Sequence, residues 1–374
     1  MNDDATLAAI AARFRVQGEF IGAERYGTGH INETYLGRYR TKNGQRRYIH
    51  QRINDRIFSD ILSLMSNVGR VTRHVRAKLE AADAGEIDRR VLSLVPTVVE
   101  TSDGADVLRA QDGSWWRTYV FIDRARTYDT IQGPVQAYQA SRAFGKFVAS
   151  LADLPGERLH ETIPAFHDTN KRLADLVITA ERDAMNRAKD VGPEIEYCLR
   201  NAGLADSLSS LQRAGIAREC VTHNDTKLNN VMIDDVTGEG VCVIDLDTVM
   251  PGIALFDFGD MVRTATMPVA EDERDISLVQ ASAEMFEALA RGFIEGAGSL
   301  LASAEREHLV AAGKVMTFEC GIRFLTDYLQ GDRYFRTHRP KQNIDRARTQ
   351  FALLESLSRQ EERLCRAVAD LALP

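Results

Sequence analysis

Apolar residues follow two different periods along this chain. In the first third they alternate with polar residues, or flank a glycine-rich turn, over residues 24–40, 46–54 and 115–123, which is typical of β-strands. Between the second and third of these segments, residues 58–82 place apolar side chains three or four positions apart, which predicts one long helix. The first third is therefore expected to be a small β-rich unit with one helix.

The remainder of the chain mostly has the helical period. Residues 138–154 predict one helix, and an apolar stripe over residues 276–293 predicts another, ended by Gly296 and Gly298. Residues 310–374 also have the helical pattern. We therefore expect the second part of the chain to be mainly helical.

One segment interrupts this helical pattern. Residues 230–247 contain two short apolar strands joined by a turn at Thr237 and Gly238. The order of elements predicts an α+β fold in two lobes. A small β-rich lobe would cover residues 1–123, and a larger helical lobe that carries the hairpin would cover residues 124–374.

Composition narrows the class of protein. The 374 residues can bury a sizeable core, and 44% hydrophobic and 27% charged residues are ordinary for a globular protein. A net charge of −7 argues against nucleic-acid or anionic membrane partners. No apolar stretch approaches the roughly 18 residues that span a bilayer, and no secretion signal is visible, so we expect a cytoplasmic protein. The five cysteines have no C-x-x-C spacing, which predicts reduced thiols.

The segment 220–252 places many polar side chains beside apolar strands. His223, Asp225 and Asn230 have the spacing H-x-D-x-x-x-x-N, which matches the catalytic loop of protein kinases. In that chemistry the Asp faces the acceptor hydroxyl, and the Asn turns back toward the metal and phosphates. Asp245 ends the next apolar strand, where a carboxylate would hold magnesium. We therefore expect ATP and Mg²⁺ as cofactors, Asp225 as the catalytic residue, and Asn230 and Asp245 as metal ligands.

A literal Asp-Phe-Gly triplet at residues 257–259 competes with Asp245 for the metal role. It follows a Pro-Gly turn and precedes no returning strand. We therefore assign the metal to Asp245 and expect Asp257 to brace the catalytic loop. His223 is expected to orient that loop through a hydrogen bond and not to act as the base.

The first lobe carries a weaker signal for nucleotide binding. Gly27 and Gly29 fit a glycine-rich loop, but Asn32 stands where a third glycine would complete G-x-G-x-x-G. The following strand has no lysine at the position that pairs with phosphates in kinases, and Gln51 or Arg52 occupies it, depending on the register. No glutamate in the first half of the long helix stands out as the usual ion-pair partner of such a lysine. We assign cofactor binding to Gly27, Gly29, Gln51 and Arg52.

Two other functions compete with a kinase. The motif "VCVIDLDTV" fits the D-x-D-x-[TV] strand of haloacid-dehalogenase-type phosphatases, with Asp245 as the nucleophile. That chemistry needs a doubly wound α/β domain and leaves the H-x-D-x-x-x-x-N motif unexplained. A non-catalytic, kinase-shaped binding protein would explain the missing lysine, but Asp225, Asn230 and Asp245 are all present. A Walker A loop is absent from the sequence, which excludes a P-loop kinase.

With these residues in view, the chain resembles the aminoglycoside phosphotransferase and choline kinase superfamily, and more closely the N-acetylhexosamine 1-kinases. The resemblance is carried by "YGTGHINETYL", "VTHNDTKLNN", "IDLDTVMPG", "LFDFGD" and "ECGIRFLTDYLQGDRYF", and covers nearly the whole chain. It implies a protein-kinase-like fold and transfer of the ATP γ-phosphoryl group to the anomeric hydroxyl of N-acetylglucosamine or N-acetylgalactosamine. The acceptor would thus be a small sugar. The sequence does not fix the oligomeric state, and we favour a monomer only slightly.

By matching motif, the resemblance makes Asp225 the base or orienter of the sugar hydroxyl. It also implies sugar contacts from His30, Arg323 and Tyr334. The residues alone leave alternatives open: His30 as a surface turn residue, Arg323 paired with Asp327 one helical turn later, and Tyr334 in the core. Another acceptor, an aminoglycoside or a choline-like amino alcohol, also remains open, because acceptor choice depends on loops.

Two polar positions outside the motif receive structural roles. Asp168 or Thr169, which follow His167, is expected to cap a helix. Arg263 is expected to pair with a nearby carboxylate.

Overall fold

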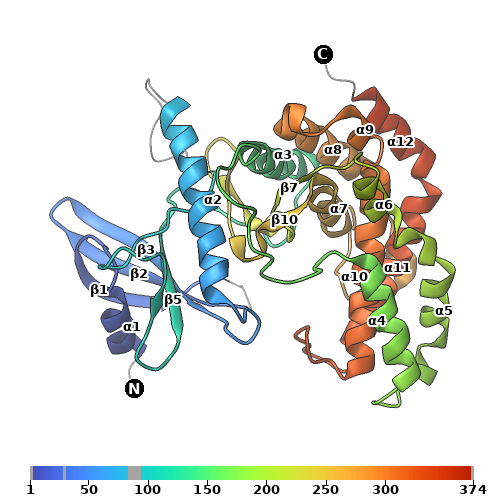
Figure 1. The fold of residues 1–374 in the computed structure, drawn as a ribbon, viewed down its shortest axis with the longest axis horizontal. Helices are drawn as coiled ribbons and strands as arrows, with labels where there is room; N and C mark the ends of the chain where they lie inside the picture. Colours follow the sequence, from blue (N-terminus) through green and yellow to red (C-terminus); the bar gives the residue numbers. More distant parts are fainter. Residues whose placement is uncertain (1–2, 28–30, 83–93, 372–374) are drawn as a thin grey trace.

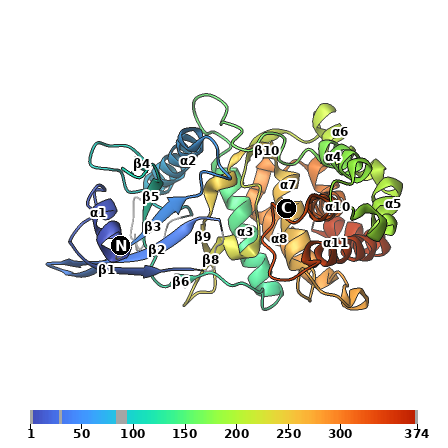
Figure 2. The ribbon, with the colours of Figure 1, turned by 90° about the horizontal axis from the view of Figure 1, so that it is seen from below.

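The computed structural model of this protein describes residues 3–27, 31–82 and 94–371. A sheet-rich lobe lies at one end of the molecule and a larger group of helices at the other (Figure 1). The view from below separates the same two groups of elements (Figure 2). Gly29 and His30, assigned above to the cofactor and the sugar, lie outside the described residues.

The smaller lobe is built on an antiparallel sheet of five described strands in the order β1-β2-β3-β5-β4. The long helix and the strands over residues 33–41, 44–53 and 115–120 occur where the apolar pattern predicted them, whereas the strand over residues 19–25 begins earlier than expected and the strand over residues 108–109 was not predicted. The elements are α1 (Asp3–Ala11), β1 (Glu19–Arg25), β2 (Glu33–Thr41), β3 (Gly44–Ile53), α2 (Ile61–Ala82), β4 (Leu108–Arg109) and β5 (Trp115–Val120).

The two faces of this sheet have different partners, because side chains alternate along each strand. Tyr48 in β3 and Trp116 in β5 pack with Phe14, which follows α1, in one hydrophobic cluster. Gln51 in β3 lies opposite Arg117 in β5 and belongs to the other face, toward α2 and the larger lobe. Gln51 and Arg52, the two candidates for nucleotide binding on β3, point to opposite faces of the sheet. The strand register therefore places only Gln51 on the face toward the larger lobe.

The larger lobe contains the remaining elements and is mainly helical, as expected. Its strands are β6 (Ala125–Arg126), β7 (Glu219–Thr222), β8 (Val231–Asp234), β9 (Gly240–Val243) and β10 (Met250–Ile253). Its α-helices are α3 (Pro134–Ser150), α4 (Thr169–Arg182), α5 (Gly192–Arg200), α6 (Ser207–Arg213), α7 (Ala254–Ala265), α8 (Ala283–Ala297), α9 (Ser303–Arg306), α10 (Leu309–Gln330), α11 (Gln342–Arg359) and α12 (Glu361–Asp370). Its 3₁₀ turns are η1 (Ala188–Asp190), η2 (Ala202–Leu204), η3 (Leu228–Asn230), η4 (Leu246–Thr248), η5 (Ile276–Leu278) and η6 (Gly298–Leu300).

The strands of the larger lobe form two small sheets, with the orders β6-β8-β9 and β10-β7. The expected strand–turn–strand segment is the β8–β9 hairpin. Every pairing between the described strands is antiparallel. A haloacid-dehalogenase-type phosphatase needs a parallel sheet with helices on both faces. That alternative is therefore wrong.

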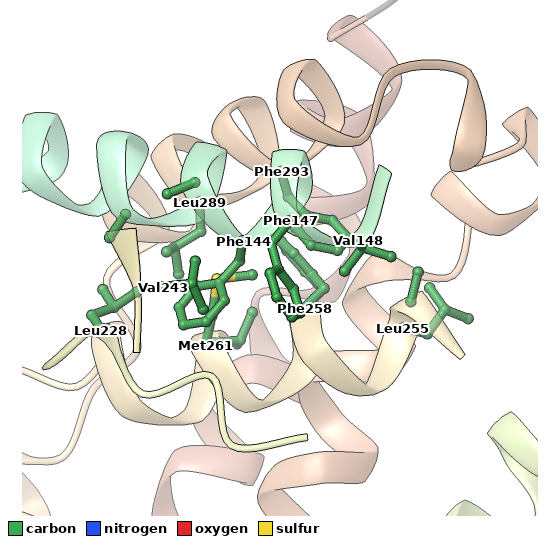
Figure 3. Packing of buried hydrophobic residues seen from close by; sticks show 14 of the residues in the cluster. Phe144, Phe147, Val148, Leu228, Val243, Leu255, Phe258, Met261, Leu289 and Phe293 are labelled. Carbon is green, nitrogen blue, oxygen red and sulfur yellow. The ribbon is translucent and has the colours of Figure 1, made fainter. Parts of the chain in front are cut away.

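The main core lies where α3, α7 and α8 meet. Figure 3 shows Phe144 and Phe147 of α3 close to Phe258 of α7, with Phe293 of α8 beside them. These four rings are fully buried. Complete burial of an aromatic or aliphatic side chain contributes on the order of 1.5–3 kcal/mol, so this cluster stabilises the packing of the three helices.

Glycines allow α3 and α8 to approach each other closely. A Cβ atom on Gly296 would lie 2.3 Å from the carbonyl oxygen of Arg142, and one on Gly292 would lie 2.3 Å from that of Tyr138. Gly296 therefore does not end the helix, as the sequence suggested, but packs inside it. The helix also begins later than expected, at Ala283, because residues 276–278 form the 3₁₀ turn η5.

Two expectations from composition can be compared with the structure. None of the five cysteines, at positions 198, 220, 242, 320 and 365, forms a disulfide bond. Within the described part of the chain, no helix has both the length and the apolar character needed to cross a bilayer.

We predict that Gly296→Ala lowers the free energy of unfolding by about 1–3 kcal/mol, because the added methyl group must push the α3 backbone away. Gly203→Ala is the matched control, since its Cβ would meet no atom within 4 Å, and it should change stability by less than about 0.5 kcal/mol. Urea unfolding followed by circular dichroism measures both. Equal stability of the two variants would contradict the close packing.

Candidate active site

The loop between β7 and β8 is held by one buried carboxylate at the start of α7. Asp257 accepts hydrogen bonds from the backbone N–H groups of His223, at 2.8 Å, and Asn224, at 2.7 Å. Asn224 has a left-handed backbone with φ of 65°, a conformation that Asn tolerates better than most residues. The prediction that Asp257 braces the catalytic loop is confirmed.

The side chain of His223 also supports this loop. Its Nε2 atom lies 2.9 Å from the carbonyl oxygen of Ile244, and its ring packs edge-on against Phe144 and Phe147. The backbone N–H of Asp225 donates to His223 Nδ1 at 3.3 Å. Because the histidine is fully buried and both ring nitrogens have partners, it orients the loop, as predicted.

Asp225, Asn230 and Asp245 meet at one cavity of about 580 Å³ between the lobes. The Asn230 side-chain amide donates to the Asp225 carbonyl oxygen at 2.9 Å and lies 3.4 Å from its carboxylate. Asp245 has φ of 59°, so the chain turns sharply there after β9. The structure thus brings together the three oxygen-bearing residues that the motif spacing selected.

The charges at this cavity differ between its two aspartates. Burial opposes ionisation of Asp225, but Lys227, at 3.2 Å, together with His223 and Arg263, holds the pKa of Asp225 below its usual value. The side chain of Asp245 is exposed to the cavity, although many protein atoms lie around it. That environment and the negative charges of Asp247 and Asp225 raise the pKa of Asp245 to about 6. A cation near Asp245 would relieve this repulsion.

The donor set suits a hard divalent cation. In the described residues, no group of three or more His, Cys, Asp and Glu side chains is arranged to hold a metal by itself. Asp245 and the amide oxygen of Asn230 would supply two oxygen ligands, which fits magnesium because it keeps waters and takes further ligands from phosphates.

The smaller lobe contributes Gly27 and Gln51 to the cavity wall. The Gln51 amide donates to Thr34 Oγ1 at 3.0 Å. Arg52 does not line this cavity; its guanidinium is exposed and lies 3.7 Å from Glu33. Of the two neighbouring candidates on β3, the structure therefore brings Gln51 to the site and leaves Arg52 on the opposite face.

Sequence reasoning missed three charged residues at this site. Lys227 lies two positions after Asp225 and lines the cavity, so its place inside the motif was an available signal. Arg117 is buried in β5 and pairs with Asp247 just after Asp245. An arginine inside the apolar strand "WWRTYV" was the available signal for that pair, because such a charge needs a partner.

The end of α10 carries Arg323 and the loop with Tyr334. Asp327 accepts hydrogen bonds from the backbone N–H groups of Arg333, Tyr334 and Phe335, at 2.8–3.0 Å. Asp327 therefore holds this loop and is not the partner of Arg323. Tyr334 is 57% exposed, so the alternative that placed it in the core is wrong.

Two guanidinium groups on this side have no carboxylate partner among the described residues. Arg323 lies over three aromatic rings, at 5.0 Å from Phe166, 5.9 Å from Tyr334 and 5.6 Å from Phe335. Arg172 Nη2 donates to the Phe166 carbonyl at 2.9 Å, but its buried Nε has no hydrogen-bond partner. Burial and the positive charge of Arg323 lower the pKa of Arg172. This region therefore has hydrogen-bond donors and positive charge without carboxylate partners, but neither of these arginines nor Tyr334 lines the interlobe cavity.

A buried network joins this region to the catalytic loop. His167 Nδ1 lies 2.8 Å from Glu319, and its Nε2 lies 3.1 Å from the carbonyl oxygen of Asn224, next to Asp225. Glu319 precedes Arg323 by one turn of α10. Arg263 pairs with Asp260 at 2.7 Å, as predicted for this residue.

The prediction that Asp168 or Thr169 caps a helix is also confirmed. Asp168 accepts a hydrogen bond from the Lys171 backbone N–H at the start of α4.

A two-lobed fold with this loop, hairpin and interlobe cavity defines a kinase-like phosphotransferase. The chain belongs to the phosphotransferase enzyme family, whose model matches residues 27–292. The family membership confirms the superfamily part of the resemblance.

Solved structures share the whole fold at low sequence identity. A spectinomycin phosphotransferase in complex with ADP and spectinomycin is 10% identical, with a TM-score of 0.56 over 99% of this chain and 98% of that chain. A choline kinase from Cryptosporidium parvum is 12% identical, with a TM-score of 0.57 over 97% of each chain. An ethanolamine kinase from Plasmodium vivax is 13% identical, with a TM-score of 0.52 over 87% of this chain and 81% of that chain. At these identities the likeness shows the fold.

We predict that Asp245→Asn and Asp257→Asn impair phosphotransfer in different ways. Asp245→Asn should raise the Mg²⁺ concentration needed for half-maximal activity and leave thermal stability near wild type. Asp257→Asn should lower the free energy of unfolding by about 1–3 kcal/mol, because its new NH₂ group would face a backbone N–H. Magnesium titrations and urea unfolding distinguish the two. A larger magnesium effect in Asp257→Asn would assign the metal to the literal Asp-Phe-Gly triplet.

Proposed function

We propose that this protein is an ATP- and magnesium-dependent sugar 1-kinase, which transfers the γ-phosphoryl group to the anomeric hydroxyl of an N-acetylhexosamine. The family membership supports phosphotransfer in general. The donor-rich region around Arg323 and Tyr334, joined to the catalytic loop through His167, is the observation that supports an oxygen-rich acceptor. The resemblance of the α10 segment to N-acetylhexosamine 1-kinases supports the particular sugar.

Nucleotide binding is assigned to the interlobe cavity. Its apolar lining includes Ile49 from the smaller lobe and Met232 and Ile244 from the larger, which could enclose a planar base. Gly27 and Gln51 would lie nearer the phosphates, and Gly29 would belong to the same glycine-rich loop. A related spectinomycin phosphotransferase is known in complex with ADP, which supports an adenine nucleotide here.

Asn230 and Asp245 would hold magnesium, which when bound would neutralise charge on the nucleotide phosphates. Asp225 is ionised near neutral pH, because nearby positive charges lower its pKa. It can orient the acceptor hydroxyl and take its proton. Lys227, paired with Asp225, places a positive charge beside the transferred group. The loose transition state of phosphoryl transfer depends mainly on this positioning.

Arg323 and Tyr334 would bind the sugar. Arg323 offers up to five N–H donors for hydroxyl and amide oxygens, and Tyr334 offers an exposed ring and a hydroxyl group. His30 would also contact the sugar, as the resemblance implies. Choline and aminoglycosides are cations, and the unpaired charges of Arg172 and Arg323 would repel them. We therefore favour the sugar over these acceptors.

We predict that Asp225→Asn lowers kcat by roughly 10²–10⁴, the range for a lost general base, with little change in thermal stability. Asp235→Asn is a suitable control, since Asp235 directly follows β8 and pairs with the exposed Arg126. Coupled-enzyme detection of ADP measures both variants. Near-normal turnover by Asp225→Asn would contradict its catalytic assignment.

Acceptor choice is tested by incubating the protein with ATP, Mg²⁺ and a panel of N-acetylhexosamines, other hexoses, an aminoglycoside and choline. We expect sugar 1-phosphate from the N-acetylhexosamines and little product from either cation. Arg323→Ala should raise the KM for the sugar at least tenfold and leave the KM for ATP within about twofold. The exposed Arg359→Ala, on α11, is the control. Preferred use of choline or the aminoglycoside would overturn the proposed acceptor.

A further inference from the structure

Among the described residues of the smaller lobe, a deeply buried arginine faces the cavity. Arg117 lies in the middle of β5 and is 1% exposed. Strand register places it opposite Gln51, on the face of the sheet toward the larger lobe. Both residues line the interlobe cavity. A guanidinium can be buried in this way only when its charge and donors are well matched, because its removal from water is costly.

The matching charge comes from the other lobe. Arg117 Nη1 is hydrogen-bonded to Asp247, and Arg117 Nε donates to Gln51 Oε1 at 2.9 Å. Nη1 also lies 3.8 Å from the sulfur of Met65 in α2. Asp247 is 3% exposed, so the ion pair is shielded from water on both sides. Burial opposes the charge on Arg117, but Asp247, followed by Tyr119 and Asp245, raises its pKa above the usual value.

The second oxygen of Asp247 is used as well. It accepts a hydrogen bond from the Asn32 side-chain amide at 2.6 Å, and Asn32 Oδ1 in turn accepts from the backbone N–H of Asn54 at 3.1 Å. Asn32 directly precedes β2, and Asn54 directly follows β3. One carboxylate of the larger lobe therefore binds residues of β5 and of the start of β2, and the end of β3 supports it through Asn32.

Asp247 lies two residues after Asp245, in the 3₁₀ turn η4. Protein kinases place a lysine of the third strand between the phosphates and a helix glutamate. Here Gln51 occupies β3, Met65 lies at the facing position of α2, and the cation comes from β5. The buried pair thus links the sheet that covers the nucleotide cavity to the segment that carries Asp245.

We propose that Arg117 and Asp247 form an interlobe pair that positions Asp245, and that Arg117 supplies the buried positive charge at the phosphate end of the cavity in place of the missing lysine. Arg117 is a positioning residue, since it acts through Asp247 and Gln51. The inference depends on phosphotransfer and nucleotide binding but is independent of which acceptor the protein uses.

The test measures nucleotide binding, so it does not require the acceptor to be known. Arg117→Met removes the charge and keeps a long side chain, and Arg117→Lys keeps the charge with fewer donors. Titration calorimetry with ADP, with and without Mg²⁺, should give a Kd for the Mg²⁺ complex at least 30-fold weaker in Arg117→Met and about 3–10-fold weaker in Arg117→Lys. Asp247→Asn should weaken Mg²⁺-dependent binding to a similar extent as Arg117→Met.

Thr118→Val is the matched control for stability. Thr118 is the next residue on β5, is fully buried, faces away from the cavity and lies 2.8 Å from the buried His50 ring. Its variant should lower the melting temperature and leave the Mg²⁺-dependent Kd for ADP within twofold of wild type. This separates loss of sheet stability from loss of positioning.

The pair is also tested as a unit. Combined Arg117→Met and Asp247→Asn should weaken binding of Mg²⁺–ADP little more than either change alone, because each single change already removes the same contact. The proposal would be overturned if the fold-change in Kd of the double variant equalled the product of the two single fold-changes. It would also be overturned if Arg117→Met bound Mg²⁺–ADP as tightly as the wild type. If Arg117→Met fails to fold, Arg117→Lys decides: unchanged binding would overturn the inference. If the wild-type protein binds Mg²⁺–ADP but does not phosphorylate the sugar, that result would contradict only the proposed acceptor.

Discussion

The two hydrogen bonds that Asp257 accepts from the backbone of residues 223–224 determine where the catalytic loop begins. They tie the loop to the start of α7, and α7 packs against α3 and α8 through the fully buried Phe258. The loop therefore takes its position from the hydrophobic core. A buried carboxylate suits this task, because it has two oxygens and can satisfy two adjacent N–H groups that would otherwise be unpaired. The sharp turn at Asn224 and the placement of Asp225 both depend on this support.

Charged neighbours give Asp225 and Asp245, the two aspartates of the cavity, different electrostatic environments. Lys227 keeps Asp225 ionised, whereas the carboxylates around Asp245 favour a cation there. Arg117 offsets part of this negative charge, because it forms an ion pair with Asp247. Since the lobes contribute opposite members of that pair, the contact between the lobes and the local balance of charge depend on the same ion pair. This arrangement explains how the site can lack the usual third-strand lysine and still contain a buried cation.

The proposed acceptor region, around Arg323 and Tyr334, is held by a different set of contacts. Asp327 uses both carboxylate oxygens to hold the loop that carries Tyr334, and Arg323 packs among aromatic rings. The guanidinium of Arg323 is thereby fixed in direction without a carboxylate partner in the described residues. A group held in this way keeps its N–H donors available for a ligand, and its cost in conformational entropy has already been met on folding.

The sequence by itself determined the lobes, most of the strands and helices, and the convergence of Asp225, Asn230 and Asp245. These features depend on local periodicity and on one short loop followed by a hairpin, where spacing along the chain largely sets spacing in three dimensions. It also indicated Asp257 as a brace. The tertiary structure decided which of Gln51 and Arg52 faces the cavity, because that choice depends on strand register. It alone paired Arg117 with Asp247, 130 residues apart, and revealed the packing role of Gly296. Such contacts join distant segments through the packing of lobes and helices, and no local pattern encodes that packing.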